Sequence, residues 1–140
     1  MNDFKEALGL GLQAADRATM ARAEIEAIFL ELNAALEAAT AGRASIRRTN
    51  LPSIASPTAR ALANVEHGRP TALAVFGGGD PPPRREIAKW RQPTGGFPCT
   101  LVWEERNVQC DDAEALRAEL IDLLRSPTVG YAIKSIVGVD

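Results

Sequence analysis

The sequence predicts an α+β protein with a long N-terminal helix, a short helix, an antiparallel β-meander of about four strands and two C-terminal helices. Three observations lead to this class. Small and apolar residues recur at alternating gaps of three and four residues from Phe4 to Ala39, which is a helical period. Short segments of alternating polarity follow between residues 71 and 111, and turns rich in glycine and proline separate them. Two capped aliphatic segments complete the chain.

The long helix is expected to run from about residue 3 to residue 40. Asp3 and Glu6 have the spacing of a capping box, and Gly42 is a natural stop. Gly9 and Gly11 are the weak positions, because each costs about 1 kcal/mol relative to Ala inside a helix. The helix either bends at these glycines or starts properly at Gln13. Its stripe consists of Phe4, Ala7, Gly11, Ala14, Ala18, Ala21, Ile25, Ile28, Leu32, Ala35 and Ala39.

The length of this helix indicates a role in assembly. A helix over residues 4–39 spans about 54 Å, whereas a compact domain of this size measures somewhat under about 40 Å. We therefore expect residues 1–42 to be a coiled-coil oligomerisation element on an α+β body at residues 43–140, with a homodimer as the simplest assembly. The alternative is a helix that lies across the protein's own sheet. The residues expected at the seam between copies are Ala14, Ala18, Ala21, Ile25, Ile28 and Leu32.

A basic connector and a short helix are expected next. Residues 43–56 are irregular in pattern, with a short strand near residues 45–48. Ser56 and Pro57 are a good N-cap and first helical residue, and Gly68 is a good stop.

The meander is expected to have strands at residues 71–76, 85–92, 99–105 and 108–111. In the second strand, Ile87 shares a face with Lys89 and Arg91, and the opposite face carries Ala88 and Trp90.

The sequence also predicts the last turn of the meander and the two helices that follow it. A tight turn at Arg106-Asn107 would place Trp103 across from Cys110. Acidic residues at 111, 112 and 114 cap a helix over about residues 112–125. The last helix opens at Ser126-Pro127-Thr128 and stops at Gly138. The first of these helices is expected to bury Leu116, Leu120, Leu123 and Leu124.

Composition favours a folded protein in a reducing compartment. The chain is 46% hydrophobic and 24% charged, which suits a globular domain. Its start lacks the basic and apolar pattern of a signal peptide, and no stretch is long and apolar enough for a membrane span. Two cysteines do not make a disulfide framework. We therefore expect a cytoplasmic protein with no membrane partner.

No pattern in the sequence predicts catalysis, a cofactor or a metal site. Residues 77–80 follow a strand, as phosphate-binding loops do, but three prolines come next instead of a helix. The single histidine, His67, and the cysteines Cys99 and Cys110 fit no zinc-site spacing. A Cys–His nucleophile pair is the remaining enzymatic alternative. The cysteines occupy inward strand positions, where thiols usually serve as inert packing.

Charge is distributed unevenly along the chain. Residues 42–98 are basic and lie between two acidic ends, although the net charge is only −2. The basic middle can pair with acidic helices of its own or a sister chain, bind another protein, or bind a nucleic acid. We expect a non-catalytic homo-oligomer that binds an unidentified protein, with nucleic-acid binding through residues 43–91 as the alternative. The candidate contact residues are Arg43, Arg47, Arg48, Arg84, Arg85, Lys89 and Arg91.

Overall fold

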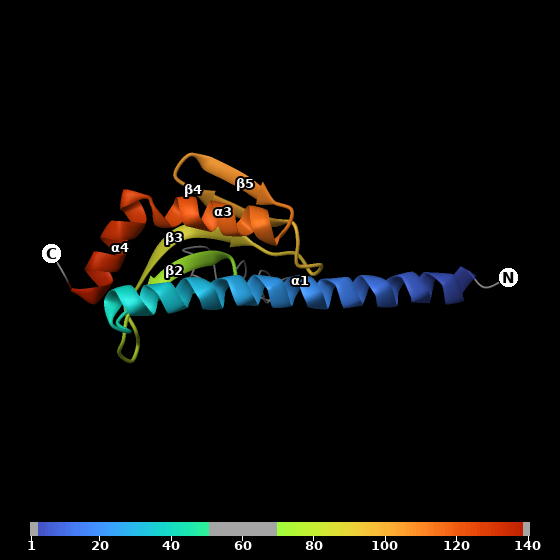
Figure 1. Ribbon diagram of the computed structural model, residues 1–140, viewed down its shortest axis with the longest axis horizontal. Coiled ribbons are helices and arrows are strands. Elements are labelled where there is room, and N and C mark those ends of the chain that lie inside the picture. Colours follow the sequence, from blue (N-terminus) through green and yellow to red (C-terminus); the bar gives the residue numbers. More distant parts are fainter. Residues whose placement is uncertain (1–2, 51–69, 139–140) are drawn as a thin grey trace, which may run out of the picture.

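The computed structural model describes residues 3–50 and 70–138, and it confirms the α+β class (Figure 1). The short helix predicted at residues 56–68 lies outside the described residues. In chain order the elements are α1 (Asp3–Thr40), β1 (Ser45–Thr49), β2 (Ala72–Phe76), β3 (Arg84–Arg91), β4 (Cys99–Trp103), β5 (Arg106–Cys110), α3 (Ala113–Leu124) and α4 (Pro127–Val137).

The strands form one antiparallel sheet in the order β1-β2-β3-β4-β5. The sheet has five strands instead of the predicted four, because the short strand near residue 45 is present and pairs with β2. The helices α1, α3 and α4 all contribute to a single apolar core with the sheet. The body is therefore a two-layer structure with helices over one sheet face (Figure 1).

The core residues follow the periods of their own elements. Leu73 and Val75 alternate along β2, and their side chains are fully buried. From the helices, Ile25, Leu116 and Val129 pack onto the same cluster and are also fully buried.

The predicted helix caps are present at the C-terminal end of the chain. The Asp112 side chain accepts a hydrogen bond from the Ala115 backbone N–H at 2.8 Å. Ser126 does the same for Val129, and Gly138 ends α4 in the left-handed conformation. One helix prediction is wrong, because Leu124 is 37% exposed. The polar residue Glu119 is buried on that helix instead.

A β-bulge in β3 overturns the predicted alternation. Leu73 pairs with Ala88 and Ala74 pairs with Glu86, so Ile87 is an extra residue in β3. The bulge resets the alternation of side chains, and Ile87 and Ala88 are both buried. The prediction that Ile87 shares the outer face with Lys89 is therefore wrong.

The β4–β5 turn lies two residues earlier than predicted. Its two residues are Glu104 and Glu105, and Glu104 has a φ of 53°. This left-handed backbone makes a tight two-residue loop. Trp103 therefore lies across from Arg106, and Cys110 lies across from Cys99 instead of Trp103.

The helix α1 is 38 residues long and extends far past the body (Figure 1). It begins at Asp3 and continues through Gly9 and Gly11 without interruption, so the alternative start at Gln13 is wrong and neither glycine divides the helix. The predicted mismatch in length is therefore present, because a helix of this length spans about 57 Å. We call its projecting part, residues 3–20, the overhang. Within the overhang every residue is exposed except the half-buried Ala18.

Candidate assembly and binding surfaces

The overhang exposes large apolar side chains to solvent. Phe4 is 88% exposed, and Leu8 and Leu12 are each 68% exposed. Together with Ala7 and Gly11, these side chains line a shallow apolar groove along the helix. Soluble monomers rarely expose large contiguous apolar patches, so this surface is a candidate binding site.

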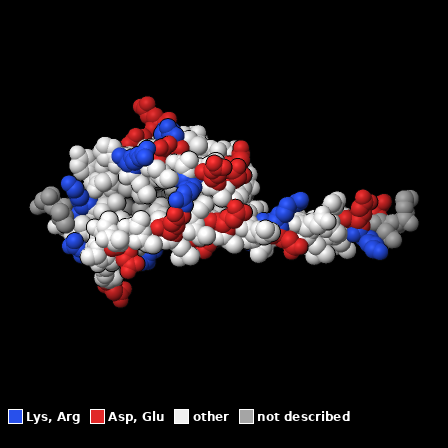
Figure 2. All heavy atoms as spheres, viewed as in Figure 1, with Lys and Arg blue, Asp and Glu red and all other residues white. Residues whose placement is uncertain are grey.

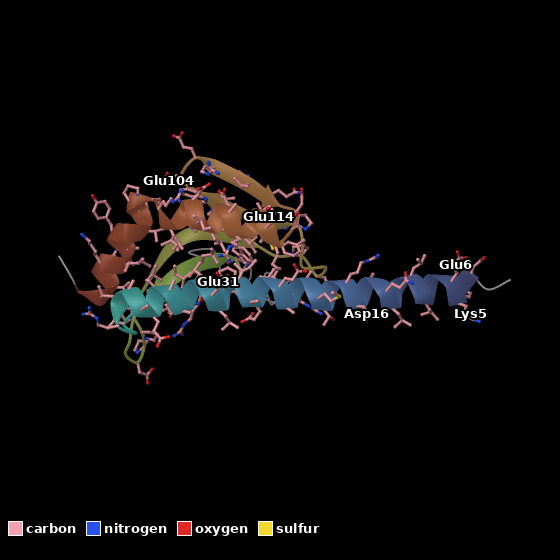
Figure 3. The ribbon with its side chains drawn as sticks, viewed as in Figure 1. Lys5, Glu6, Asp16, Glu31, Glu104 and Glu114 are labelled. Carbon is pink, nitrogen blue, oxygen red and sulfur yellow. The ribbon has the colours of Figure 1, made fainter. Side chains whose placement is uncertain are left out.

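The middle of the overhang has no charged residue at all. Residues 7–15 contain one polar side chain, Gln13. Figure 2 shows this stretch as an uncharged region between two groups of charges. Figure 3 places Lys5 and Glu6 at its tip and Asp16 nearer to the body. A helix that is apolar on all sides is normally buried, but no described residue of the body covers this stretch.

The predicted seam is divided by the structure into two parts. Ala14 is exposed and Ala18 is half-buried, so both remain available to a second copy. Ala21, Ile25 and Leu32 are buried in the chain's own structure, and Ile28 packs against the same core. The lower part of the stripe therefore corresponds to the alternative expectation, a helix lying on its own sheet.

The contact between α1 and the body begins at Ala21. The loop before β4 approaches so closely there that a Cβ on Gly96 would lie 2.6 Å from the Ala21 Cβ. Further along, the rings of Phe29 and Trp90 meet edge to face with centroids 5.5 Å apart. These contacts fix the direction in which the overhang projects.

An asparagine on α1 also joins the helix to the edge of the sheet. The Asn33 side chain donates to the Ile46 carbonyl at 2.9 Å and accepts from the Ile46 N–H at 2.7 Å. It therefore satisfies both outward backbone groups of one residue in the edge strand β1. Edge strands with unpaired groups invite pairing with other chains, and Asn33 removes that opportunity at this position.

The two basic clusters of the sequence are separated by the alternation of the strands. Arg48 lies on the helix side of the sheet, with its guanidinium 4.8 Å from the Phe29 ring centroid and an ion pair to Glu26. Arg85 lies on the same side and donates to the Ser135 hydroxyl in α4 at 2.8 Å. These two arginines hold helices onto the sheet. Arg43 lies in the turn after α1 and donates to the Thr40 carbonyl.

The remaining candidates share the opposite face of the sheet, which we call the basic face. They are exposed. Arg47, Arg84 and Lys89 pair in register with residues of β2 outside the core cluster, and Arg91 pairs with Thr100 of β4. One acidic residue, Glu86, lies among them. The basic face consists of Arg47, Arg84, Lys89 and Arg91. Each of the two basic clusters in the sequence therefore has only some of its residues on the basic face.

The cysteines are buried across from each other on β4 and β5. Burial raises the pKa of the Cys99 thiol to about 12 and that of Cys110 to about 11. Both thiols therefore remain protonated at neutral pH, and a protonated thiol is a weak nucleophile. His67, the other member of the alternative enzymatic pair, lies outside the described residues.

A buried carboxylate that the sequence analysis did not identify joins α3 to the β4–β5 hairpin. Glu119 accepts from the Trp103 indole N–H at 2.8 Å and from two nitrogens of Arg106, at 3.1 and 2.7 Å. Burial raises the pKa of Glu119, but the hydrogen bonds from Arg106 and Trp103 outweigh it, and the net pKa is lowered. The carboxylate is fully partnered, which is typical of a structural role.

Within residues 3–50 and 70–138, no group of three or more His, Cys, Asp or Glu side chains could hold a metal ion. None of the helices in that part of the chain has the length and apolar character of a membrane span. Comparisons with protein-family profiles, curated proteins and solved structures gave no match.

Proposed function

We propose that the protein is a non-catalytic, homo-oligomeric module that binds another macromolecule. The observation that carries this proposal is the overhang, whose exposed apolar side chains have no cover within the described chain. Fully burying a side chain such as Phe or Leu contributes about 1.5–3 kcal/mol. Several such side chains on each copy favour association over exposure to water.

Helix stability supports the same conclusion. Most helical stability in proteins comes from tertiary packing, and the overhang has no such packing within the described residues. It also contains two glycines, which lower its helix propensity. The attachment to the body stabilises the overhang helix only at its C-terminal end. A partner that covers the apolar stretch would stabilise the helical form along its whole length.

The first test is the absolute mass in solution, measured by light scattering after size exclusion at two salt concentrations. A multiple of 15.0 kDa that persists at both salt concentrations supports self-association through apolar contacts. A 15.0 kDa species at all concentrations examined would overturn the proposal.

A matched pair of variants locates the contact. Leu8 in the overhang is 68% exposed, and Leu30 on the body part of α1 is 65% exposed. Leu8→Glu is expected to lower the mass to that of the monomer, because the new charge would have to be buried in an apolar contact. Leu30→Glu, on the same helix with nearly the same exposure, is expected to leave the assembly intact.

The basic face supports a second candidate function, the binding of nucleic acid. Four cationic side chains lie on one sheet face, where Glu86 and Glu104 line a hollow together with Lys89. Trp90 lies on the other face and is buried, so the basic face lacks Trp90 as a stacking platform for bases.

Fluorescence anisotropy with labelled single- and double-stranded oligonucleotides would test this candidate. Affinity that falls steeply with salt and is lost in Lys89→Glu with Arg91→Glu would support nucleic-acid binding through counterion release. No binding at about 0.15 M salt would leave an acidic protein surface as the partner proposed for this face.

A further inference from the structure

We infer that the overhang pairs with the overhang of a second copy in antiparallel orientation. The inference rests on the proposed self-association and adds the direction and register of the contact. It follows from which side of α1 is apolar, where the body begins, and how size and charge vary along the overhang.

The apolar stripe keeps to one side of α1 along its full length. Its spacing of three and four residues continues from the overhang into the part that packs on the body. Ile25 and Leu32 on this stripe are buried by the chain's own core. A helix that covers Ala7, Gly11 and Ala14 therefore lies on the side of α1 that the body occupies further along.

The position of the body excludes a parallel pair in register. A parallel partner would continue along the stripe past Ala18 and meet the body at Ala21, where the Gly96 backbone already touches α1. An antiparallel partner instead ends with its own N-terminal tip at that point. Its body then lies beyond the tip of the first helix, where Figure 1 shows no helix or strand.

The sizes of the side chains suit one antiparallel register. The 18 residues of the overhang span about 27 Å. Overlap of residues 5–20 of the two copies sets Ala7 opposite Ala18 and Gly11 opposite Ala14, as alternating seam positions require. These small residues allow the two backbones to approach closely. The large Phe4 then reaches the end of the seam, next to the partner's body.

The charges at the two ends of the overhang disfavour a parallel pair. The tip carries Asp3, Lys5 and Glu6, with one excess acid, whereas the end near the body carries Asp16 and Arg17, which balance. Parallel pairing would bring the two acidic tips together. Antiparallel pairing sets each acidic tip beside the balanced end of the other copy, with Asp3 opposite Arg22. Exposed charges of this kind contribute little to affinity, so they favour an orientation and leave the affinity to apolar burial.

Disulfide crosslinking with single-cysteine positions tests the orientation. Ala7→Cys and Ala18→Cys are prepared separately, mixed and exposed to mild oxidation, because a disulfide needs Cα atoms within about 7 Å. The native cysteines are buried, and the unmodified protein serves as the background. We expect a dimer band on a non-reducing gel in the mixture and none with either variant alone.

The outcomes separate this inference from the proposed function. A dimer band from Ala18→Cys alone would indicate parallel helices and overturn the orientation while keeping self-association. A dimer by mass that crosslinks in no combination would show that another surface joins the copies and would also overturn the inference. A monomer by mass would overturn both. Mixing Ala7→Cys with Ala27→Cys, which lies off the stripe, is the matched negative control.

Discussion

At the scale of single residues, Glu119 shows how a polar side chain can be part of a core. It is 5% exposed, and its oxygens receive hydrogen bonds from both Trp103 and Arg106. The guanidinium of Arg106 also lies over the Trp103 ring, 5.3 Å from its centroid. This group of three side chains fixes α3 on the β4–β5 hairpin.

Replacing Glu119 with Gln should destabilise the fold by about 1–3 kcal/mol, because Arg106 loses its charged partner. The Gln amide also places N–H donors where one carboxylate oxygen accepted, so the hydrogen bond to that oxygen is lost. Urea unfolding followed by circular dichroism measures the change. Glu31→Gln is the control, since Glu31 pairs with Arg117 at an exposed position and exposed pairs contribute little.

The stability that Glu119 contributes should also depend on pH. The folded-state pKa of Glu119 is lowered from 4.5, so the stability it contributes is present above that value. The contribution is lost as pH falls through the lowered folded-state pKa. The difference between wild type and Glu119→Gln should therefore be largest near neutral pH and shrink in acid. A difference that stays constant down to acidic pH would contradict this role.

At the scale of elements, the attachment of α1 to β1 depends on a side chain that imitates a strand. Asn33 makes both hydrogen bonds that a neighbouring strand would make to Ile46. Asn33→Ala should cost about 1–3 kcal/mol, because a part-buried N–H and C=O would lose their partners. Hydrogen exchange at the Ile46 amide should speed up in this variant. Asn33→Asp keeps an acceptor for the Ile46 amide, so exchange at this amide should change less in Asn33→Asp than in Asn33→Ala. Unchanged exchange at Ile46 in Asn33→Ala would contradict the role of Asn33.

The elements differ in how far the sequence specifies them. The helix caps at Asp112 and Ser126 were predicted from neighbouring residues and are present. The turn at Glu104-Glu105 was missed, because Asn107 is the more usual turn residue. The bulge at Ile87 was missed as well. Both depend on how a strand pairs with its neighbour, which local residue patterns report only weakly.

At the scale of the whole molecule, a long helix divides into a part that stabilises the body and a part that projects from it. Residues 3–17 are exposed and contribute no side chain to the core. Deleting residues 1–17 should therefore give a folded monomer. Thermal unfolding of the full chain should shift to higher temperature with protein concentration, because association stabilises the folded state. The shortened chain should show no such shift, and a shift in both chains would place the contact on the body.

The candidate surfaces were predicted from the sequence only in part. The apolar stripe and the seven basic residues were identified, but the sequence did not show that Ile25 is covered by the sheet. It also did not show that Arg48 and Arg85 hold helices while Lys89 and Arg91 face outward. Glu119 gave no distinctive signal, because its partners are 13 and 16 residues away.

The sequence by itself determined the class of the fold, the continuous stripe of α1 and the caps of the C-terminal helices. These features depend on residues within a few positions of each other, and the helical and strand periods make them visible. Only the tertiary structure decided where the body ends on α1, which basic residues share a face and which carboxylate is buried. Those features depend on contacts between segments far apart in the chain, and their geometry is set when helices and sheet pack around one core.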